Sequence, residues 1–308
     1  MGKLTRRSRI GFIGAGTVGK SLALALSRQG YPVVAVSSRS FSSAQELAHL
    51  VIGVTAYETV DGTAGAVDVI FITSPDDAIG TVVSSIPWRP EQAAVHCSGV
   101  SSLDVLEPAL VMGAAVGSFH PMQAFSSVKT GVKSIPGTTF GIEGDGEMRA
   151  YLEQMATSIG GRPIFLRPED KALYHLSGVM MGGLLSSLAA VAAQLWEHLG
   201  MQRADGVRAL APMMRQVSIN LETSGVPGGL QGPYMRGDLG TIKKHLQTLR
   251  ARAPDVLPLY CHMALAALPF ALEKGTLSTD TAEEIWDLIN QYKDLGGTQD
   301  GGYYHGEH

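Results

Sequence analysis

Cysteine is scarce in this sequence, which has two cysteines among 308 residues. Cys97 and Cys261 lie far apart in the chain and show no metal-ligand spacing. We therefore expect neither a disulfide scaffold nor a metal site. The low cysteine usage favours a reducing compartment, and we predict a cytoplasmic protein.

Charged residues are also few, because they make up 17% of the chain, and the formal net charge is −4. No broad basic field is available for nucleic acid or for acidic membranes, so we expect neither as a partner. Hydrophobic residues make up 45% of the chain, which excludes a disordered protein. The length suggests two domains with substantial cores.

One long run lacks charge entirely. Residues 176–196 contain no Asp, Glu, Lys or Arg, and a helix of this length could cross a bilayer. The serines, the glutamine and the three glycines in the run argue against a membrane span, as does the lack of flanking aromatic belts. We expect a buried central helix whose small residues let another helix approach closely. This helix also predicts a homodimer formed through the helical domain.

The first half of the chain alternates apolar β-type runs with helical patterns. Strands are predicted at 9–14, 32–37, 67–73, 93–97 and 114–119. A helix is predicted at 18–29, Ser43 and Glu46 are spaced as a capping box, and Asp76 and Asp77 are placed to cap another helix. This alternation indicates an α/β protein with a doubly wound parallel sheet of the Rossmann type.

The second half changes character after Pro168. A last pair of strands, 138–142 and 163–166, is predicted around a helix at 148–158. Further helices are predicted at 169–199, 203–222, 238–250, 255–273 and 278–292. We therefore expect a dinucleotide-binding domain at 1–167 and an all-α substrate and dimerisation domain at 168–308. The tail from Gly296 is expected to fray.

A G-x-G-x-x-G motif links the first predicted strand to the first predicted helix. It consists of Gly14, Ala15, Gly16, Thr17, Val18 and Gly19. In this context Gly14 allows a tight turn, Gly16 lets the backbone approach a pyrophosphate, and Gly19 allows close packing of helix on strand. The helix N-terminus offers free N–H groups to the phosphates. The alternative is a glycine-rich turn without a ligand.

The end of the second predicted strand indicates which dinucleotide binds. Ser37, Ser38 and Arg39 stand where an enzyme specific for NAD has an acidic residue for the ribose hydroxyls. Hydroxyl groups and a guanidinium suit a 2′-phosphate, because arginine presents a planar charged fork to phosphate oxygens. We therefore predict NADP rather than NAD. The alternative is that Arg39 is only a solvated loop residue.

Several further motifs carry a family resemblance. They are DVIFITSPDD at 68–77, HCSG at 96–99, SFHPMQAF at 118–125, KALYH at 171–175 and GPYMRGD at 232–238. With the glycine motif, the first half resembles the 6-phosphogluconate dehydrogenase-like superfamily, which includes β-hydroxyacid dehydrogenases, ketopantoate reductase and pyrroline-5-carboxylate reductase. More closely, nearly the whole chain resembles a branch of NADP oxidoreductases with a Rossmann-like domain and a helical C-terminal domain of unknown function.

The resemblance implies an arrangement and two residue roles. It implies a long helical domain that buries a dimer interface, and a cleft between the domains where the nicotinamide meets a substrate. In β-hydroxyacid dehydrogenases a lysine and an asparagine four residues later line this cleft. Lys171 matches the lysine, and His175 takes the place of the asparagine.

Reduction of a carbonyl or imine needs a hydride donor and a group that supplies a proton or polarises the acceptor. Lys171 and His175 share one face of a predicted helix, where a lysine with a lowered pKa could act as the acid. His120 ends a predicted strand at the carboxyl edge of the sheet, where open α/β sheets bind ligands. The alternatives are a surface lysine, a packed His175 and a His120 that only holds its loop.

Other candidate residues follow strands or lie in the glycine-rich loop. The residues expected to wall the cofactor cleft are Thr73, Ser74, Pro75, Ser98 and Gly99. We expect Ser98 and Gly99 to approach the cofactor by backbone alone. Arg236 could clamp a substrate carboxylate, with Asp238 orienting it. The favoured alternative is that Asp238 caps the helix that begins at Leu239 and pairs with Arg236.

The sequence thus predicts an NADP-dependent oxidoreductase that transfers a hydride between the nicotinamide and a small carbonyl or imine substrate in the interdomain cleft. The alternative is a non-catalytic dinucleotide-binding protein that senses redox state. An enzyme needs a second pocket beside the nicotinamide, lined by Lys171, His175 and His120, whereas a sensor needs only the dinucleotide site.

Overall fold

The computed structural model describes residues 4–293. The chain divides into two compact units, Met1–Leu184 and Leu185–His308. This division lies further along the chain than the boundary expected after residue 167, because the next helix is tied to the sheet through the buried Lys171. The predicted fraying from Gly296 concerns residues outside the described range.

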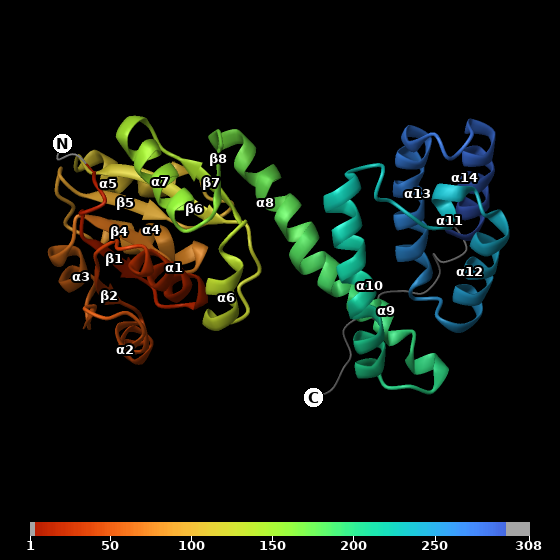
Figure 1. Cartoon of the computed structure of the whole chain (residues 1–308), viewed down its shortest axis with the longest axis horizontal. Helices are drawn as coiled ribbons and strands as arrows, with labels where there is room; N and C mark the ends of the chain where they lie inside the picture. Colours follow the sequence, from red (N-terminus) through yellow and green to blue (C-terminus); the bar gives the residue numbers. More distant parts are fainter. Residues whose placement is uncertain (1–3, 294–308) are drawn as a thin grey trace. The chain divides into compact units, whose positions relative to one another are not determined.

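The first unit is built on one sheet of eight strands (Figure 1). The strands are β1 (Ile10–Ile13), β2 (Val33–Ser37), β3 (Thr55–Tyr57), β4 (Val69–Ile72), β5 (Ala93–His96), β6 (Ala115–Pro121), β7 (Thr139–Glu143) and β8 (Arg162–Phe165). They lie in the order β3-β2-β1-β4-β5-β6-β7-β8, and neighbours run parallel except that β7 is antiparallel to β6. The predicted Rossmann-type fold is confirmed, but the reversal at β7 and the short edge strand β3 were not predicted.

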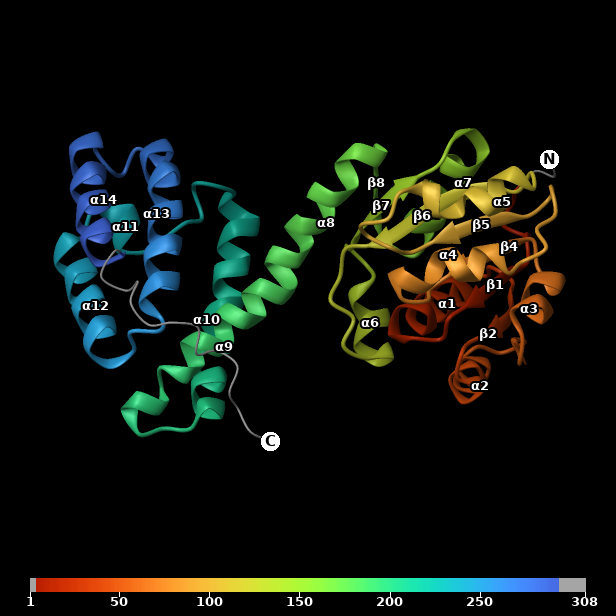
Figure 2. The same cartoon turned by 180° about the vertical axis from the view of Figure 1, so that it is seen from behind.

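Helices cover both faces of this sheet (Figure 2). The helices of the first unit are α1 (Thr17–Arg28), α2 (Phe41–Leu50), α3 (Val60–Ala66), α4 (Asp76–Ser84), α5 (Glu107–Val111), α6 (Val128–Ser134), α7 (Gly146–Ser158) and α8 (Lys171–Val179). The helices α1, α2 and α7 pack on one face, whereas α3, α4 and α5 pack on the other. Because both faces are covered, β1 and β4 are fully buried and form continuous apolar runs in the sequence.

A row of phenylalanines crosses the core of the sheet. It consists of Phe12 from β1, Phe71 from β4, Phe119 from β6 and Phe140 from β7, all fully buried. Successive ring centroids in this row are 5.2, 5.9 and 4.5 Å apart. Burial of one such ring stabilises a fold by about 1.5–3 kcal/mol, so the row is a major support of the strands that position the site.

Two of the predicted helix caps are wrong. α2 begins at Phe41, so Ser43 lies inside its first turn, and no side chain caps its N-terminus. α4 begins directly after Pro75, so Asp76 and Asp77 lie in its first turn rather than at the cap position. In both cases the helix starts earlier than the capping pattern implies. The two carboxylates of α4 still complement the positive end of the helix.

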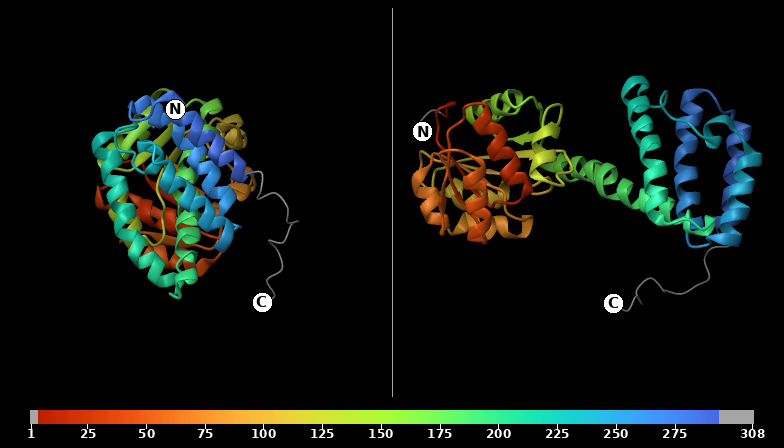
Figure 3. Two further views of the ribbon diagram at one scale, coloured as in Figure 1. Left: turned by 90° about the vertical axis from the view of Figure 1, so that its right-hand side faces the viewer. Right: turned by 60° about the horizontal axis from the view of Figure 1, so that its bottom comes forward.

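The second unit contains helices and no strand within residues 185–293 (Figure 3). Its helices are α9 (Leu185–Gln194), α10 (Arg203–Ser224), α11 (Pro233–Arg236), α12 (Leu239–Arg252), α13 (Leu257–Lys274) and α14 (Thr279–Lys293). Its core draws mainly on α12, α13 and α14, for example Leu246, Cys261 and Ile285. The predicted helices are confirmed, except that the expected helix at 169–199 is interrupted by a π-helical segment, Met180–Leu184.

The uncharged run at 176–196 is not a buried central helix. The segment Pro168–Leu199 is long and apolar enough to cross a membrane. Its most apolar stretch of 18 residues has a mean hydropathy of 1.7, and 6% of that stretch is buried. Leu176, Met181 and Leu184 are among its exposed side chains. The expectation of a buried helix is therefore wrong, because the side chains of this run are mostly exposed.

Candidate functional site

The carboxyl ends of parallel strands bring the predicted cofactor residues to one edge of the sheet. Backbone hydrogen bonds connect these ends. The N–H of Gly14 donates to the carbonyl of Ser37 at 2.9 Å, and the N–H of Thr73 donates to the carbonyl of Ile13 at 2.8 Å. The glycine motif therefore starts where β1, β2 and β4 meet.

The three glycines of the motif have different surroundings. Gly14 has a φ of 104°, and a Cβ there would lie 2.6 Å from the carbonyl carbon of Thr73. A Cβ on Gly19 would lie 2.6 Å from both the Gly14 carbonyl oxygen and Thr73 Oγ1. Gly16 is exposed, and a Cβ there would meet no atom within 4 Å. Packing therefore requires Gly14 and Gly19, whereas the backbone at Gly16 faces open space.

The N-terminus of α1 offers free hydrogen-bond donors. Gly16 occupies the cap position, no side chain caps the helix, and the first turn contains no acidic residue. Ala15 is buried, whereas Thr17 and Val18 are partly exposed in the first turn. The first N–H groups of a helix have no intrahelical acceptor, so this end can bind an anion such as a pyrophosphate.

The residues after β2 also have unused polar groups. Ser37 is buried, and its hydroxyl has no hydrogen-bond partner among the described residues. Ser38 is half-buried, and Arg39 is exposed. The guanidinium of Arg39 makes no ion pair or hydrogen bond within residues 4–293. A free guanidinium beside a hydroxyl is a suitable donor set for a 2′-phosphate.

The residues after β4 differ in what they can offer a ligand. Thr73 Oγ1 donates to the Gly14 carbonyl at 2.7 Å, which commits it to the glycine turn. Pro75 occupies the cap position of α4 and has no N–H. The hydroxyl of Ser74 is buried without a partner in the described part of the chain. Of these three side chains, Ser74 therefore keeps hydrogen-bonding capacity.

Two of the predicted catalytic residues, His120 and His175, meet at Gly99. Their ring centroids are 5.8 Å apart. A Cβ on Gly99 would lie 2.4 Å from His175 Cδ2 and 2.7 Å from His120 Nε2, so both rings pack directly against the backbone of Gly99. Tyr174, which the sequence interpretation missed, has its Oη 3.1 Å from His120 Nδ1. Gly99 thus provides the space for two imidazoles, a role that the sequence did not suggest.

Burial determines the protonation of this cluster. It lowers the pKa of His120 to about 4, with smaller contributions from His175 and Lys171. It also raises the pKa of Tyr174 to about 12. At neutral pH a neutral imidazole therefore lies beside a protonated phenol. The phenol also donates to the backbone carbonyl of His120 at 3.4 Å, so the tautomer of the ring sets whether Nε2 offers a proton or a lone pair to a ligand.

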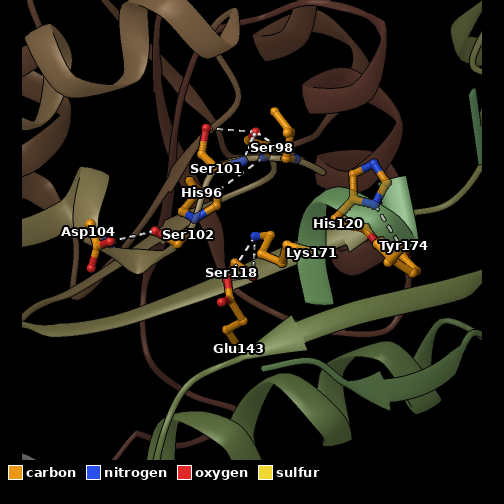
Figure 4. A network of polar contacts seen from close by, with 11 residues as sticks. His96, Ser98, Ser101, Ser102, Asp104, Ser118, His120, Glu143, Lys171 and Tyr174 are labelled. Atoms are coloured by element: carbon orange, nitrogen blue, oxygen red, sulfur yellow. Dashed lines mark hydrogen bonds and ion pairs between the residues drawn. The ribbon is translucent and has the colours of Figure 1, made fainter. Parts of the chain in front are cut away.

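Ser98 closes the turn that carries Gly99 (Figure 4). Its Oγ accepts hydrogen bonds from the N–H groups of Val100 and Ser101 at 3.3 and 3.0 Å. Its own N–H donates to Nδ1 of the buried His96 at 3.1 Å. Ser98 therefore acts on the loop conformation, and the loop in turn holds Gly99 against the two rings.

Lys171, the third predicted catalytic residue, is completely buried (Figure 4). Its Nζ lies 2.8 Å from Glu143 Oε2 and donates to Ser118 Oγ at 3.1 Å. Ser118 Oγ donates to the same carboxylate oxygen at 3.1 Å. Burial lowers the pKa of Lys171, whereas the adjacent Glu143 raises it. The alternative of a surface lysine is therefore wrong, and the ammonium points to strands β6 and β7.

The surroundings of Lys171 contain two further titratable groups. Burial and the charge of Lys171 lower the pKa of His96 to about 3. Burial raises the pKa of the Cys97 thiol to about 12, so this cysteine is an unreactive neutral group. Both cysteines are free. Within residues 4–293 no group of three or more His, Cys, Asp or Glu could hold a metal ion.

Arg236 and Asp238 belong to the second unit, whereas the other predicted site residues all belong to the first. Asp238 Oδ1 accepts a hydrogen bond from the N–H of Thr241 at 3.0 Å, which confirms the favoured cap at the start of α12. This bond also lowers the pKa of Asp238. Arg236 is exposed and forms no ion pair with Asp238, so the expected pairing is wrong.

The strand order, the helices on both faces and the open glycine cradle define a Rossmann-type nucleotide-binding protein. Residues 3–121 match the family model of a Rossmann-like domain, and residues 138–267 match that of a domain of unknown function, DUF2520. The chain therefore belongs to the proteins that combine these two domains, as its motifs predicted. No curated protein matches the chain.

Solved structures of similar proteins cover most of the chain. A "putative NADP oxidoreductase" from Bacteroides fragilis is 25% identical with a TM-score of 0.69, covering 86% of this chain and 99% of its own. A Thermotoga maritima protein is 24% identical with a TM-score of 0.70, covering 85% and 99%. A reductive aminase from Aspergillus terreus, in complex with NADPH and ethyl-5-oxohexanoate, is 16% identical with a TM-score of 0.57, covering 94% and 95%. The last two likenesses concern the fold alone.

Proposed function

We propose that this protein is an NADP-dependent oxidoreductase that transfers a hydride between the nicotinamide and a small carbonyl or imine compound. The observation that carries the proposal is the open backbone at Gly16 together with the unpaired Arg39 at the end of β2. The description of the Bacteroides fragilis protein as an NADP oxidoreductase supports it. The NADPH bound to the Aspergillus terreus reductive aminase is consistent with the same cofactor.

The residues present can hold such a cofactor. The N–H groups of Gly16 and the first turn of α1 would bind the pyrophosphate. Ser38 and Arg39 would bind the 2′-phosphate, and Ser74 can add a hydrogen bond from the end of β4. When bound, the nicotinamide supplies or accepts the hydride.

His120 is the group best suited to act on the substrate. Hydride addition to a carbonyl or imine develops negative charge on oxygen or nitrogen, which a positioned N–H donor stabilises. Nε2 of the neutral His120 is such a donor in the tautomer in which Nδ1 accepts a hydrogen bond from Tyr174. His175 shares the contact at Gly99 and is retained as a second member of the site. Lys171 is buried and acts on this site through its charge, which contributes to the lowered pKa of His120.

A binding titration tests the cofactor assignment. The protein, Arg39→Ala and the control Arg28→Ala are titrated with NADPH and with NADH. Arg28 is also exposed but lies in the last turn of α1, at the opposite end from the glycine motif. Loss of one charge-assisted hydrogen bond costs about 1.5–3 kcal/mol, so Arg39→Ala should weaken NADPH binding by roughly tenfold or more. NADH binding, and all binding by Arg28→Ala, should not change.

A turnover assay then separates an enzyme from a redox sensor. The protein is incubated with NADPH and a panel of cyclic imines and 2-keto acids, and nicotinamide absorbance is followed. Oxidation of NADPH that stops in His120→Asn supports the proposed enzyme. Tight NADPH binding without oxidation by any member of the panel would support the non-catalytic alternative.

We also propose that two copies associate through the helical part of the chain in the cytoplasm. Within the second unit, α9 and α10 carry exposed apolar side chains, including Leu188, Met213 and Ile219. Soluble proteins rarely leave extended apolar patches exposed, so a second copy is the expected cover. Light scattering on protein extracted without detergent should give the mass of a dimer. A monomer, or protein that stays in the membrane fraction, contradicts this proposal.

A further inference from the structure

Polar side chains form a row across three adjacent buried strands. His96 on β5 is the register partner of Ser118 on β6, and Ser118 is the partner of Glu143 on β7. Register partners point to the same face of a sheet, so the three side chains lie in line. All three residues are buried. Lys171 completes the row from α8 (Figure 4).

Burial of its two charges makes this row a weak source of stability for the fold. The Lys171 and Glu143 side chains are 1% and 3% exposed, so both charges lose nearly all their hydration. Two further polar atoms in the row, His96 Nε2 and Glu143 Oε1, have no hydrogen-bond partner among the described residues. A buried ion pair is often no more stable than apolar side chains of similar volume. The row therefore needs another reason for its polarity.

The reason lies in what else α8 carries. Tyr174 and His175 are three and four residues after Lys171, so all three side chains share one face of the helix. Beneath them, Gly141 is two residues before Glu143 on β7, so a side chain at position 141 would lie on the same face of the sheet as Glu143.

α8 meets β7 at both of these positions. Lys171 pairs with Glu143, and a Cβ on Gly141 would lie 2.9 Å from the Oη of Tyr174. Gly141 is the register partner of His120, the ring that the phenol contacts. The ion pair therefore fixes the position and rotation of α8 directly beside the His120 cluster.

We propose that Glu143 is a positioning residue, which by holding Lys171 sets where α8 presents Tyr174 and His175 to His120. The charged hydrogen bonds are directional, whereas apolar packing would let the helix shift or rotate. This inference rests on the proposed function in so far as the His120 cluster meets the substrate. Burial, the facing His175 and the charge of Lys171 all lower the pKa of His120 and keep it neutral.

The histidine rings report this positioning without a substrate. Protein with carbon-labelled histidine is compared by NMR with four variants: Glu143→Gln, Lys171→Met, the double variant Glu143→Leu/Lys171→Met, and the control Glu153→Gln. Glu153 is exposed on α7, so its substitution removes an equal charge without touching the row. The signals of His120 and His175 are assigned from their Asn variants.

Glu143→Gln should displace the signals of both rings, and Lys171→Met should raise the pKa of His120, whereas Glu153→Gln should match the unmodified protein. Turnover of a substrate found in the panel should fall by roughly a hundredfold in Glu143→Gln, the scale of a displacement of about 1 Å. The KM for NADPH should not change, because the glycine motif is separate.

The double variant keeps the test decisive if a single variant does not fold. It should recover thermal stability, because no buried charge is left unpaired, but it should recover neither the ring signals nor turnover. The inference would be overturned if the double variant recovered its thermal stability, its ring signals and its turnover. It would also be overturned if the ring signals of Glu143→Gln were unchanged. Failure of the proposed function is a different result, namely no NADPH binding by the unmodified protein, and leaves the ring comparison intact.

Discussion

Alanine substitutions at two glycines of the same motif should have different effects, one on thermal stability and the other on NADPH binding. A Cβ on Gly19 would lie 2.6 Å from the Gly14 carbonyl oxygen, so α1 must move away from β1. Overpacking of this kind typically costs about 1–3 kcal/mol. A Cβ on Gly16 would meet nothing within 4 Å, and the φ of −75° suits alanine. Replacing the glycine cap destabilises α1, whereas alanine makes the unfolded chain less flexible and so stabilises the folded state. Each effect is below about 1 kcal/mol, and because they have opposite signs the net change in the free energy of unfolding should be small.

Thermal unfolding and NADPH titration of the two variants separate these effects. Gly19→Ala should lower the Tm by roughly 2–4 °C for each kcal/mol lost. Gly16→Ala should keep the Tm but weaken NADPH binding by at least about tenfold, equivalent to about 1.4 kcal/mol, because its methyl group occupies the space of the pyrophosphate. If Gly16→Ala binds NADPH as tightly as the unmodified protein, the cradle does not hold the pyrophosphate and the reasoning is refuted.

Three further predictions concern the rest of the chain. Gly99→Ala should abolish turnover, because its Cβ would lie 2.4 Å from His175 Cδ2; unchanged turnover would exclude the ring cluster from the site. The pKa of His120 is lowered from 6.5 to about 4, so the unfolded chain binds a proton that the folded chain does not. The free energy of unfolding should therefore fall as the pH is lowered from about 6.5 towards 4, and His120→Asn should weaken this dependence in urea titrations. Asp238→Ala should lower the Tm through the lost cap, with NADPH affinity unaffected; altered affinity would instead implicate this loop in binding.

The parts of the fold that could be predicted are those with a local signal. The strands of the first unit are buried on both faces and appear as apolar runs, and the glycine motif lies between one such run and an amphipathic helix. The helices of the second unit begin and end near the predicted positions for the same reason. Pairing direction has no such signal, so the reversal of β7 against β6 was missed.

The site was predicted only in part because its chemistry depends on register. Glu143 is the partner of Lys171 because β7 runs antiparallel to β6 and brings Glu143 beside Ser118, which no spacing in the sequence indicates. Tyr174 could have been found, since it lies on the helix face of Lys171. The exposure of the apolar run at 176–196 was missed because composition does not indicate what covers a helix.

The most direct test of the account is the ratio of initial rates with NADPH and with NADH, measured on one imine or keto acid from the panel. The unmodified protein should be faster with NADPH, and Arg39→Ala should remove this preference by slowing the NADPH reaction alone. Equal rates with both cofactors in both proteins, or no oxidation of either, would contradict an NADP-dependent reductase.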